Sequence, residues 1–200
     1  MGKHVDYYFS LNSPWAYLGS ARFAALVARH GATVSVKPVD YSRIFPQSGG
    51  LPLPKRAPQR QAYRLMELQR WRDWLKVPLV LHPKAFPSPE TPRVQMVLAA
   101  RSAGGDGDAM RLAHALMAAL WADDLDVNDV VVLDRVAAAA GFDGAKLRAA
   151  GADPAIAGGY DVDTEAAMAR GVFGAPTYIV DGEIFWGQDR LDFLDRKLAA

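Results

Sequence analysis

The 200-residue sequence contains no cysteine, which removes disulfide bonds, thiolate metal sites and thiol catalysis from the protein itself. Any sulfur nucleophile in its chemistry must therefore come from a ligand. The chain has only 4 histidines, and no two of them stand at a metal-ligand spacing, so we predict no metal site. A Gly-x-Gly-x-x-Gly motif or phosphate-binding loop is also missing after the first predicted strand.

Strong charge of one sign and long apolar runs are missing as well. The formal net charge is +1 and 22% of the residues are charged, which makes nucleic acid a poor candidate partner. No apolar stretch reaches the roughly 18 residues of a membrane span, and the first residues lack the pattern of a signal peptide. We therefore expect a cytoplasmic protein with no membrane partner and no nucleic-acid partner.

The hydrophobic pattern predicts a strand, a helix and a second strand at the start of the chain. A β-branched and aromatic run over residues 5–9 is followed by Pro14, which is suited to open a helix, and Gly31 is suited to end it. Alternating residues over 33–39 predict the second strand. A parallel pair of strands joined by a right-handed connection is expected.

Helical patterns dominate the middle of the chain, and strands return near its end. We predict a surface loop over residues 47–58, helices over residues 59–76, 93–103, 109–122, 128–140, 144–150 and 160–170, two strands within residues 177–186 and a closing helix over residues 190–198. This order predicts an α/β, thioredoxin-like fold with a large all-helical insertion. Residues 1–42 and 158–200 would form the thioredoxin-like domain, and residues 43–157 the helical insertion domain.

Three short segments carry residues suited to chemistry. Ser13 precedes the first helix, where free backbone N–H groups stabilise an anion, although a plain N-cap is also a common use of serine there. Ala175-Pro176 joins a helix to a strand, where a trans peptide bond is the usual form. Asp189 and Arg190 would either bind an amine and a carboxylate together or form a surface ion pair. In a split thioredoxin fold these segments converge at one end of the sheet.

The same segments carry a resemblance to a known family. Residues 9–18 (FSLNSPWAYL), 172–177 (VFGAPT) and 185–191 (FWGQDRL) resemble motifs of the 2-hydroxychromene-2-carboxylate isomerases and kappa-class glutathione transferases of the DsbA-like group. The resemblance covers essentially the whole chain, including the helical insertion. It implies a thioredoxin-like fold of the DsbA and kappa glutathione transferase kind, with glutathione as the cofactor.

The resemblance also implies a role for each matching residue. Ser13 would be the catalytic residue beside the glutathione sulfur, and Pro176 would be a cis-proline whose neighbour Ala175 pairs through its backbone with the glutathione peptide. The residues expected to bind the γ-glutamyl end of glutathione and to line its wall are Trp186, Gly187, Gln188, Asp189 and Arg190.

The loop expected to bind the substrate departs from the family pattern. Family isomerases of aromatic breakdown carry a lysine shortly after the second strand and then an Asn-Arg pair, which hold the substrate carboxylate. The nearest positions here are Phe45 and Pro54-Lys55, and Arg43, Lys55 or Arg56 are open alternatives for the anion contact. The candidate substrate residues are Arg43, Phe45, Lys55 and Phe86.

The activity that the resemblance implies is a glutathione-dependent isomerisation in aromatic catabolism. A glutathione thiolate would add to 2-hydroxychromene-2-carboxylate or a related unsaturated aromatic acid and then be eliminated. One alternative is a kappa-class glutathione transferase that conjugates glutathione to electrophiles, and another is a non-catalytic glutathione-binding or chaperone-like module. We expect a small aromatic or electrophilic substrate and a homodimer.

Overall fold

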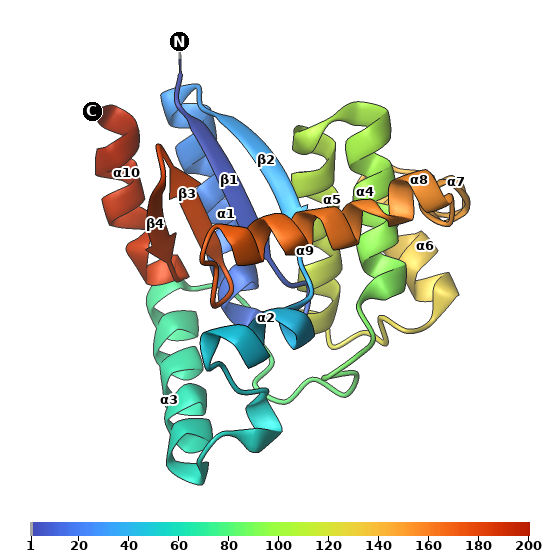
Figure 1. Ribbon diagram of the computed structural model, residues 1–200. Helices are drawn as coiled ribbons and strands as arrows, with labels where there is room; N and C mark the ends of the chain where they lie inside the picture. The colour runs from blue at the N-terminus through green and yellow to red at the C-terminus, as the bar shows by residue number, and fades with distance from the viewer. Residues whose placement is uncertain (1) are drawn as a thin grey trace.

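The computed structural model describes residues 2–200, so Met1, which begins the predicted thioredoxin-like domain, lies outside the described residues. A mixed sheet with the strand order β2-β1-β3-β4 lies at the centre of the molecule (Figure 1). β1 (His4–Phe9) pairs in parallel with β2 (Thr33–Pro38). On its other side β1 pairs antiparallel with β3 (Thr177–Val180), which pairs antiparallel with β4 (Glu183–Trp186). The predicted thioredoxin-like fold is confirmed.

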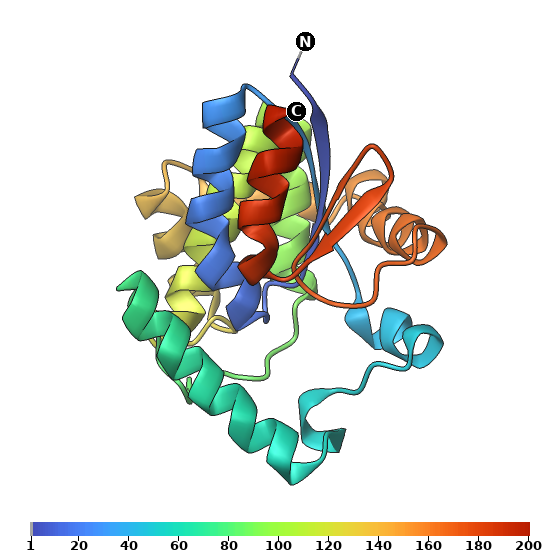
Figure 2. The ribbon, with the colours of Figure 1, turned by 90° about the vertical axis from the view of Figure 1, so that its left-hand side faces the viewer.

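In chain order the helices are α1 (Pro14–His30), α2 (Tyr41–Ser48), the 3₁₀ turn η1 (Leu53–Lys55), α3 (Pro58–Leu75), α4 (Thr91–Gly104), α5 (Asp106–Trp121), α6 (Val130–Ala139), α7 (Gly144–Gly151), α8 (Pro154–Ala157), α9 (Gly159–Ala169), the 3₁₀ turn η2 (Gln188–Arg190) and α10 (Leu191–Ala199). Figure 2 shows α1 and α10 side by side on one side of the sheet and α9 with α2 on the other. The sheet is therefore a middle layer between helices.

Alternate residues of β1 supply the two cores that these layers bury. Tyr7 and Phe9 stack with ring centroids 4.6 Å apart, and Tyr7 also stacks on Tyr178 of β3 at 5.2 Å. These rings belong to the larger core, which includes residues of α1, α4 and α5. Tyr8 points to the other face and joins a smaller core with Ile179 and with residues of α2 and α9. The aromatic strand residues thus serve both faces, because side chains alternate along a strand.

The helical insertion is bonded to the free edge of β2. The Val36 N–H donates to Asp106 Oδ1 at 2.7 Å, and the Val36 carbonyl accepts from Arg101 Nη1 at 2.6 Å. The same Arg101 atom donates to Asp163 of α9 at 2.7 Å. An edge strand otherwise leaves such backbone groups unpaired. The domain boundaries near residues 42 and 157 stay a prediction, since the larger core is continuous across the sheet and the insertion.

Two local predictions need correction. The predicted loop over residues 47–58 overlaps the end of α2 and contains η1, because Asp40 caps α2 by accepting from the Ser42 N–H at 2.8 Å and Ile44 is buried under it. The short helix α8 was not predicted; Asp153 caps it by accepting from the Ala155 N–H at 2.9 Å. The other predicted helices and strands are present, with ends that differ by a few residues.

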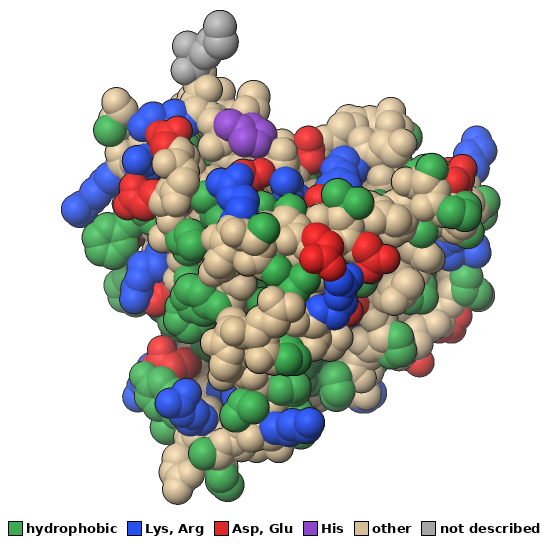
Figure 3. Space-filling view, viewed as in Figure 1, with side chains coloured by type: hydrophobic (Ala, Val, Ile, Leu, Met, Phe, Trp, Pro, Cys, Tyr) green, Lys and Arg blue, Asp and Glu red, His purple; other side chains and the backbone are tan. Residues whose placement is uncertain are grey.

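The face of the molecule seen in Figure 1 carries charges of both signs without a large field of either. Figure 3 shows lysine and arginine side chains interspersed with aspartate and glutamate on the face seen in Figure 1. The sequence contains nearly equal numbers of basic and acidic residues, 23 and 22. Among residues 2–200, no helix combines the length and the apolar character needed to cross a bilayer.

Candidate active site

The three segments singled out in the sequence meet at one end of the sheet. The strand register places Tyr8 opposite Thr177, and Thr177 opposite Trp186. The chain beyond these positions is the 10–13 loop, the Ala175-Pro176 segment and Gly187. The Gly187 N–H donates to the Pro176 carbonyl at 2.8 Å, which joins two of the segments directly. The predicted convergence is therefore present.

Ser13 is the N-cap of α1 and is half-buried. Its Oγ accepts a hydrogen bond from the Ala16 N–H at 3.1 Å, and Pro14 begins the helix after it. A hydroxyl both donates and accepts, so the cap leaves the Ser13 O–H hydrogen available. Among residues 2–200 that hydrogen has no acceptor. The capping role is confirmed, and the same hydroxyl can still donate to a ligand at the positive end of the helix dipole.

The loop before β3 contains the Ala175-Pro176 segment. The Ala175-Pro176 peptide bond is cis, as predicted. The Gly174 carbonyl accepts hydrogen bonds from the Tyr41 hydroxyl at 2.8 Å and the Thr177 hydroxyl at 2.6 Å, so the loop is fixed from two sides. Burial raises the pKa of Tyr41, which keeps this donor protonated. Within the described part of the chain, the Ala175 N–H and carbonyl have no hydrogen-bond partner.

An aromatic wall stands beside this loop. Trp186 is half exposed, and its ring packs edge-on against Phe173 with centroids 4.8 Å apart. Gly174 fits under the indole, since a Cβ there would lie 2.3 Å from the Trp186 ring nitrogen. Gly187 follows with a φ of 101°, a conformation that favours glycine, and turns the chain into η2. These glycines allow the wall to approach the loop closely.

The turn η2 divides its residues between the interior and the surface. Gln188 is buried, and its Oε1 accepts from Arg22 of α1 at 2.8 Å. Its side chain is therefore engaged within the protein. Asp189 and Arg190 are exposed and form an ion pair with each other at 2.8 Å. Such a surface pair contributes little stability, so both charges remain open to a ligand that carries an amine and a carboxylate.

A buried carboxylate that the sequence did not single out holds the backbone just before Ser13. Glu90 Oε1 accepts from the Ser10 hydroxyl and Glu90 Oε2 accepts from the Leu11 N–H, each at 2.7 Å. Burial raises the pKa of Glu90, and the Ser10 hydrogen bond and the Arg93 charge oppose that rise. One side chain from the start of α4 therefore fixes two successive residues of the 10–13 loop.

Arg93 completes this buried polar cluster. The side chain is fully buried, and its Nη2 donates to Asn12 Oδ1 at 2.9 Å and to Ser88 Oγ at 2.6 Å. The Asn12 amide donates in turn to the Ser88 carbonyl at 2.7 Å. Arg93 Nε and Nη1 have no partner among the described residues. The only sequence signal for the cluster is a cation at a helical position surrounded by apolar residues.

The predicted substrate residues do not form one group. Arg43 and Phe45 lie on α2, where Arg43 pairs with Asp161 at 2.9 Å and also with Glu165. Lys55 is exposed at the end of η1. Phe86 lies on the connection before α4 and packs against Trp121, with ring centroids 4.9 Å apart. The charge of Arg43 is thus already neutralised within the protein.

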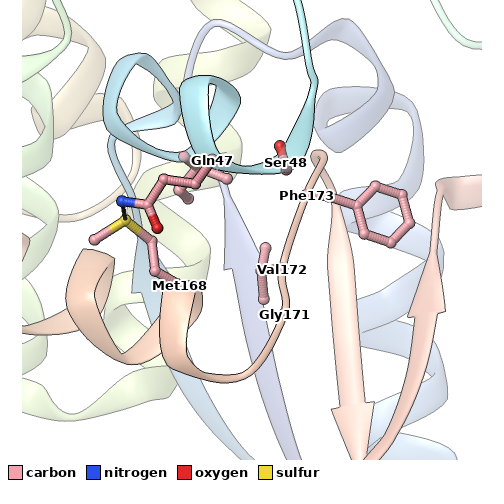
Figure 4. Close-up of a pocket in the computed structure, with 7 residues that line it drawn as sticks. Gln47, Ser48, Met168, Gly171, Val172 and Phe173 are labelled. Carbon is pink, nitrogen blue, oxygen red and sulfur yellow. Dashed lines mark hydrogen bonds between the residues drawn. The ribbon is translucent and has the colours of Figure 1, made fainter.

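A hollow of about 370 Å³ lies between α2 and the loop after α9 (Figure 4). Its lining residues are Ile44, Gln47, Ser48, Met168, Gly171, Val172 and Phe173. The Gln47 amide nitrogen contacts the Met168 sulfur at 3.0 Å across it. Figure 4 shows the Phe173 ring pointing away from these two side chains, toward β4. None of the predicted site residues lines this hollow.

Comparisons with known proteins agree with the observed fold and identify proteins that are similar to this chain. Residues 4–199 match the family described as the DSBA-like thioredoxin domain. A 2-hydroxychromene-2-carboxylate isomerase of Sphingobium xenophagum is 32% identical over 99% of each chain. A solved 2-hydroxychromene-2-carboxylate isomerase aligns with a TM-score of 0.81 and 27% identity over 98% of this chain and 94% of that one. The cytosolic disulfide reductase DsbM of Pseudomonas aeruginosa, solved with GSH, has a TM-score of 0.66 and 19% identity over 98% of this chain and 100% of its own.

Replacing Glu90 should loosen the 10–13 loop. We expect Glu90→Gln to lower the free energy of unfolding by about 1–3 kcal/mol, because an amide has one acceptor oxygen for the two donors, Ser10 and Leu11. Urea unfolding followed by circular dichroism measures the change. Glu183→Gln is the matched control, since that exposed carboxylate pairs only at the surface, 3.0 Å from Lys197, and should cost less than about 1 kcal/mol. Equal losses in the two variants would contradict the role given to Glu90.

Proposed function

The chain belongs to the DSBA-like thioredoxin domain family, and from this premise we propose that it is a glutathione-dependent isomerase of 2-hydroxychromene-2-carboxylate or a related unsaturated aromatic acid. The observation that carries the proposal is the 32% identity over 99% of both chains to an isomerase of that name. The sequence has no cysteine, so a disulfide reductase or oxidase activity has no thiol to use. The thiol of the reaction is then that of the cofactor.

Glutathione fits the site because the site presents what a short peptide needs. The free N–H and carbonyl of Ala175 can pair with an extended peptide backbone, as an exposed strand edge does. Asp189 and Arg190 offer one charge of each sign to an amino-acid head group, and Trp186 and Gly187 line the wall beside them. The Gln188 side chain is hydrogen-bonded to Arg22, so Gln188 helps to hold η2 in place beside this wall.

Ser13 acts on the sulfur and is not itself the nucleophile. Glutathione, when bound, would supply the thiolate nucleophile that such an isomerisation needs. The Ser13 hydroxyl donates a hydrogen bond to the sulfur, and the N-terminus of α1 stabilises the negative charge. Both effects lower the thiol pKa toward the ambient pH, where a thiolate is populated and still nucleophilic.

Two further expectations accompany this function. A cytoplasmic location fits an enzyme that uses reduced glutathione, because the cytosol keeps the glutathione pool reduced. The homodimer expected from the resemblance stays a prediction. The substrate of the proposed enzyme is a small aromatic acid. The proposed reaction needs no nucleic-acid partner.

Product analysis tests the proposed function. Incubated with 2-hydroxychromene-2-carboxylate, the protein should form a ring-opened isomer of unchanged mass only when glutathione is present, and mass spectrometry should recover all the glutathione. S-methylglutathione is the control, because it keeps the peptide but has no free thiol. A product that retains glutathione would show a transferase instead. No turnover under any of these conditions would contradict an enzymatic function on this substrate.

The role of Ser13 has a second, independent test. Ser13→Ala should raise the pKa of the bound thiol by about one to two pH units, since a hydrogen bond to a charged partner is lost. Thiolate absorbance measured against pH gives this value. Asp129→Ala is the control, because Asp129 caps α6 by accepting from the Val131 N–H at 2.8 Å and its loss costs about 0.5–2 kcal/mol of stability away from the site. If both variants lose stability and neither changes the thiol titration, Ser13 is only a cap.

A further inference from the structure

One hollow combines aromatic and aliphatic walls with an arginine that has no counter-ion among residues 2–200. It measures about 230 Å³ and lies between α3, η1 and the connection that leads to α4. Its lining residues are Leu53, Gln61, Arg64, Leu65, Leu81, His82, Pro83 and Phe86. We call it the Arg64 pocket. None of its lining residues belongs to the proposed glutathione site.

Arg64 and His82 are the basic residues that line the pocket, and within the described part of the chain Arg64 is unpaired. Within residues 2–200 it forms no ion pair and no hydrogen bond through its side chain, whereas Arg43, Arg101 and Arg148 each pair with a carboxylate. Its guanidinium lies 5.7 Å from the Phe86 ring centroid and 5.9 Å from the Trp121 centroid. Burial, with a smaller effect of Arg56, lowers the pKa of Arg64 to about 10. An anion bound in the pocket would stabilise the charged guanidinium and so raise the pKa of Arg64 again.

The Arg64 pocket is connected to the Ser13 loop through a few residues. Phe86 precedes Pro87 and then Ser88, whose carbonyl accepts from the Asn12 amide at 2.7 Å. Asn12 is the residue before Ser13. The aromatic wall of the pocket therefore continues into the segment that fixes the start of α1.

We propose that the Arg64 pocket binds the aromatic carboxylate end of the substrate, with the Arg64 guanidinium paired to the carboxylate and the ring against Phe86. The identity of the substrate class rests on the function proposed above. Arginine presents a planar fork that matches a carboxylate with two parallel hydrogen bonds. The leucines at positions 53, 65 and 81 surround the ring with apolar surface, as small-molecule sites do. This assigns the anion contact to Arg64 in place of Arg43, which is already paired, or the exposed Lys55.

Calorimetry with an unreactive probe and no glutathione tests the pocket alone. The probes are trans-2-hydroxycinnamate, which carries the ring and the carboxylate, and its neutral amide. Arg64→Gln should weaken binding of the carboxylate by about 10- to 100-fold and leave binding of the amide nearly unchanged. Arg60→Gln is the matched control, because Arg60 is exposed one turn earlier on α3 and should leave both affinities unchanged.

A second variant keeps the proposal testable if Arg64→Gln folds poorly. Phe86→Leu should weaken both probes, since it removes the ring contact and keeps the charge. The proposal is overturned if the wild-type protein binds no carboxylate probe at millimolar concentration, if Arg64→Gln binds it as well as the wild type, or if Arg60→Gln loses as much. Glutathione is titrated in parallel: a protein that binds the probe through Arg64 but does not bind glutathione keeps the pocket and refutes the proposed function.

Discussion

The candidate site depends on the buried contact between Glu90 and the backbone before Ser13. The 10–13 loop has no regular structure of its own, and the two carboxylate oxygens of Glu90 accept from Ser10 and Leu11 at 2.7 Å each. Arg93 fixes the next residue, Asn12, at 2.9 Å. Leaving a buried hydrogen-bond donor without its acceptor typically costs about 1–3 kcal/mol. The loop geometry is therefore strongly constrained although it lies at the surface end of the sheet.

This constraint on the 10–13 loop sets the direction in which the N-terminus of α1 faces. A helix N-terminus attracts an anion wherever it is exposed, but the direction in which its cap faces is set by the preceding loop. With residues 10–12 fixed to the start of α4, Ser13 is presented at the same sheet end as the Ala175 backbone and the charges of η2. The helical insertion thus positions a site whose proposed cofactor contacts all come from the thioredoxin-like part.

Local signals explain what the sequence could predict. Pro14 and Gly31 mark the ends of α1 through their own backbone preferences, and the alternation within β1 and β2 marks the strands. The roles of Glu90 and Arg64 are not readable in this way. Glu90 meets Ser10 from 80 residues away, and Arg64 lies beside the rings of Phe86 and Trp121, which are distant from it in the sequence. The prolines near α2 favour a loop in the sequence. The Asp40 cap and the buried Ile44 nevertheless stabilise a helix there.

The proposed glutathione site lies where the start of α1, the Ala175-Pro176 loop and η2 meet. Titration of ¹⁵N-labelled protein with glutathione, followed through the amide chemical shifts, shows whether glutathione binds there. The largest shifts should fall on the amides of Ser13, Ala16, Ala175, Gly187 and Asp189, because these line the three segments. Shifts confined to other parts of the chain, or no shifts at millimolar glutathione, would contradict the account.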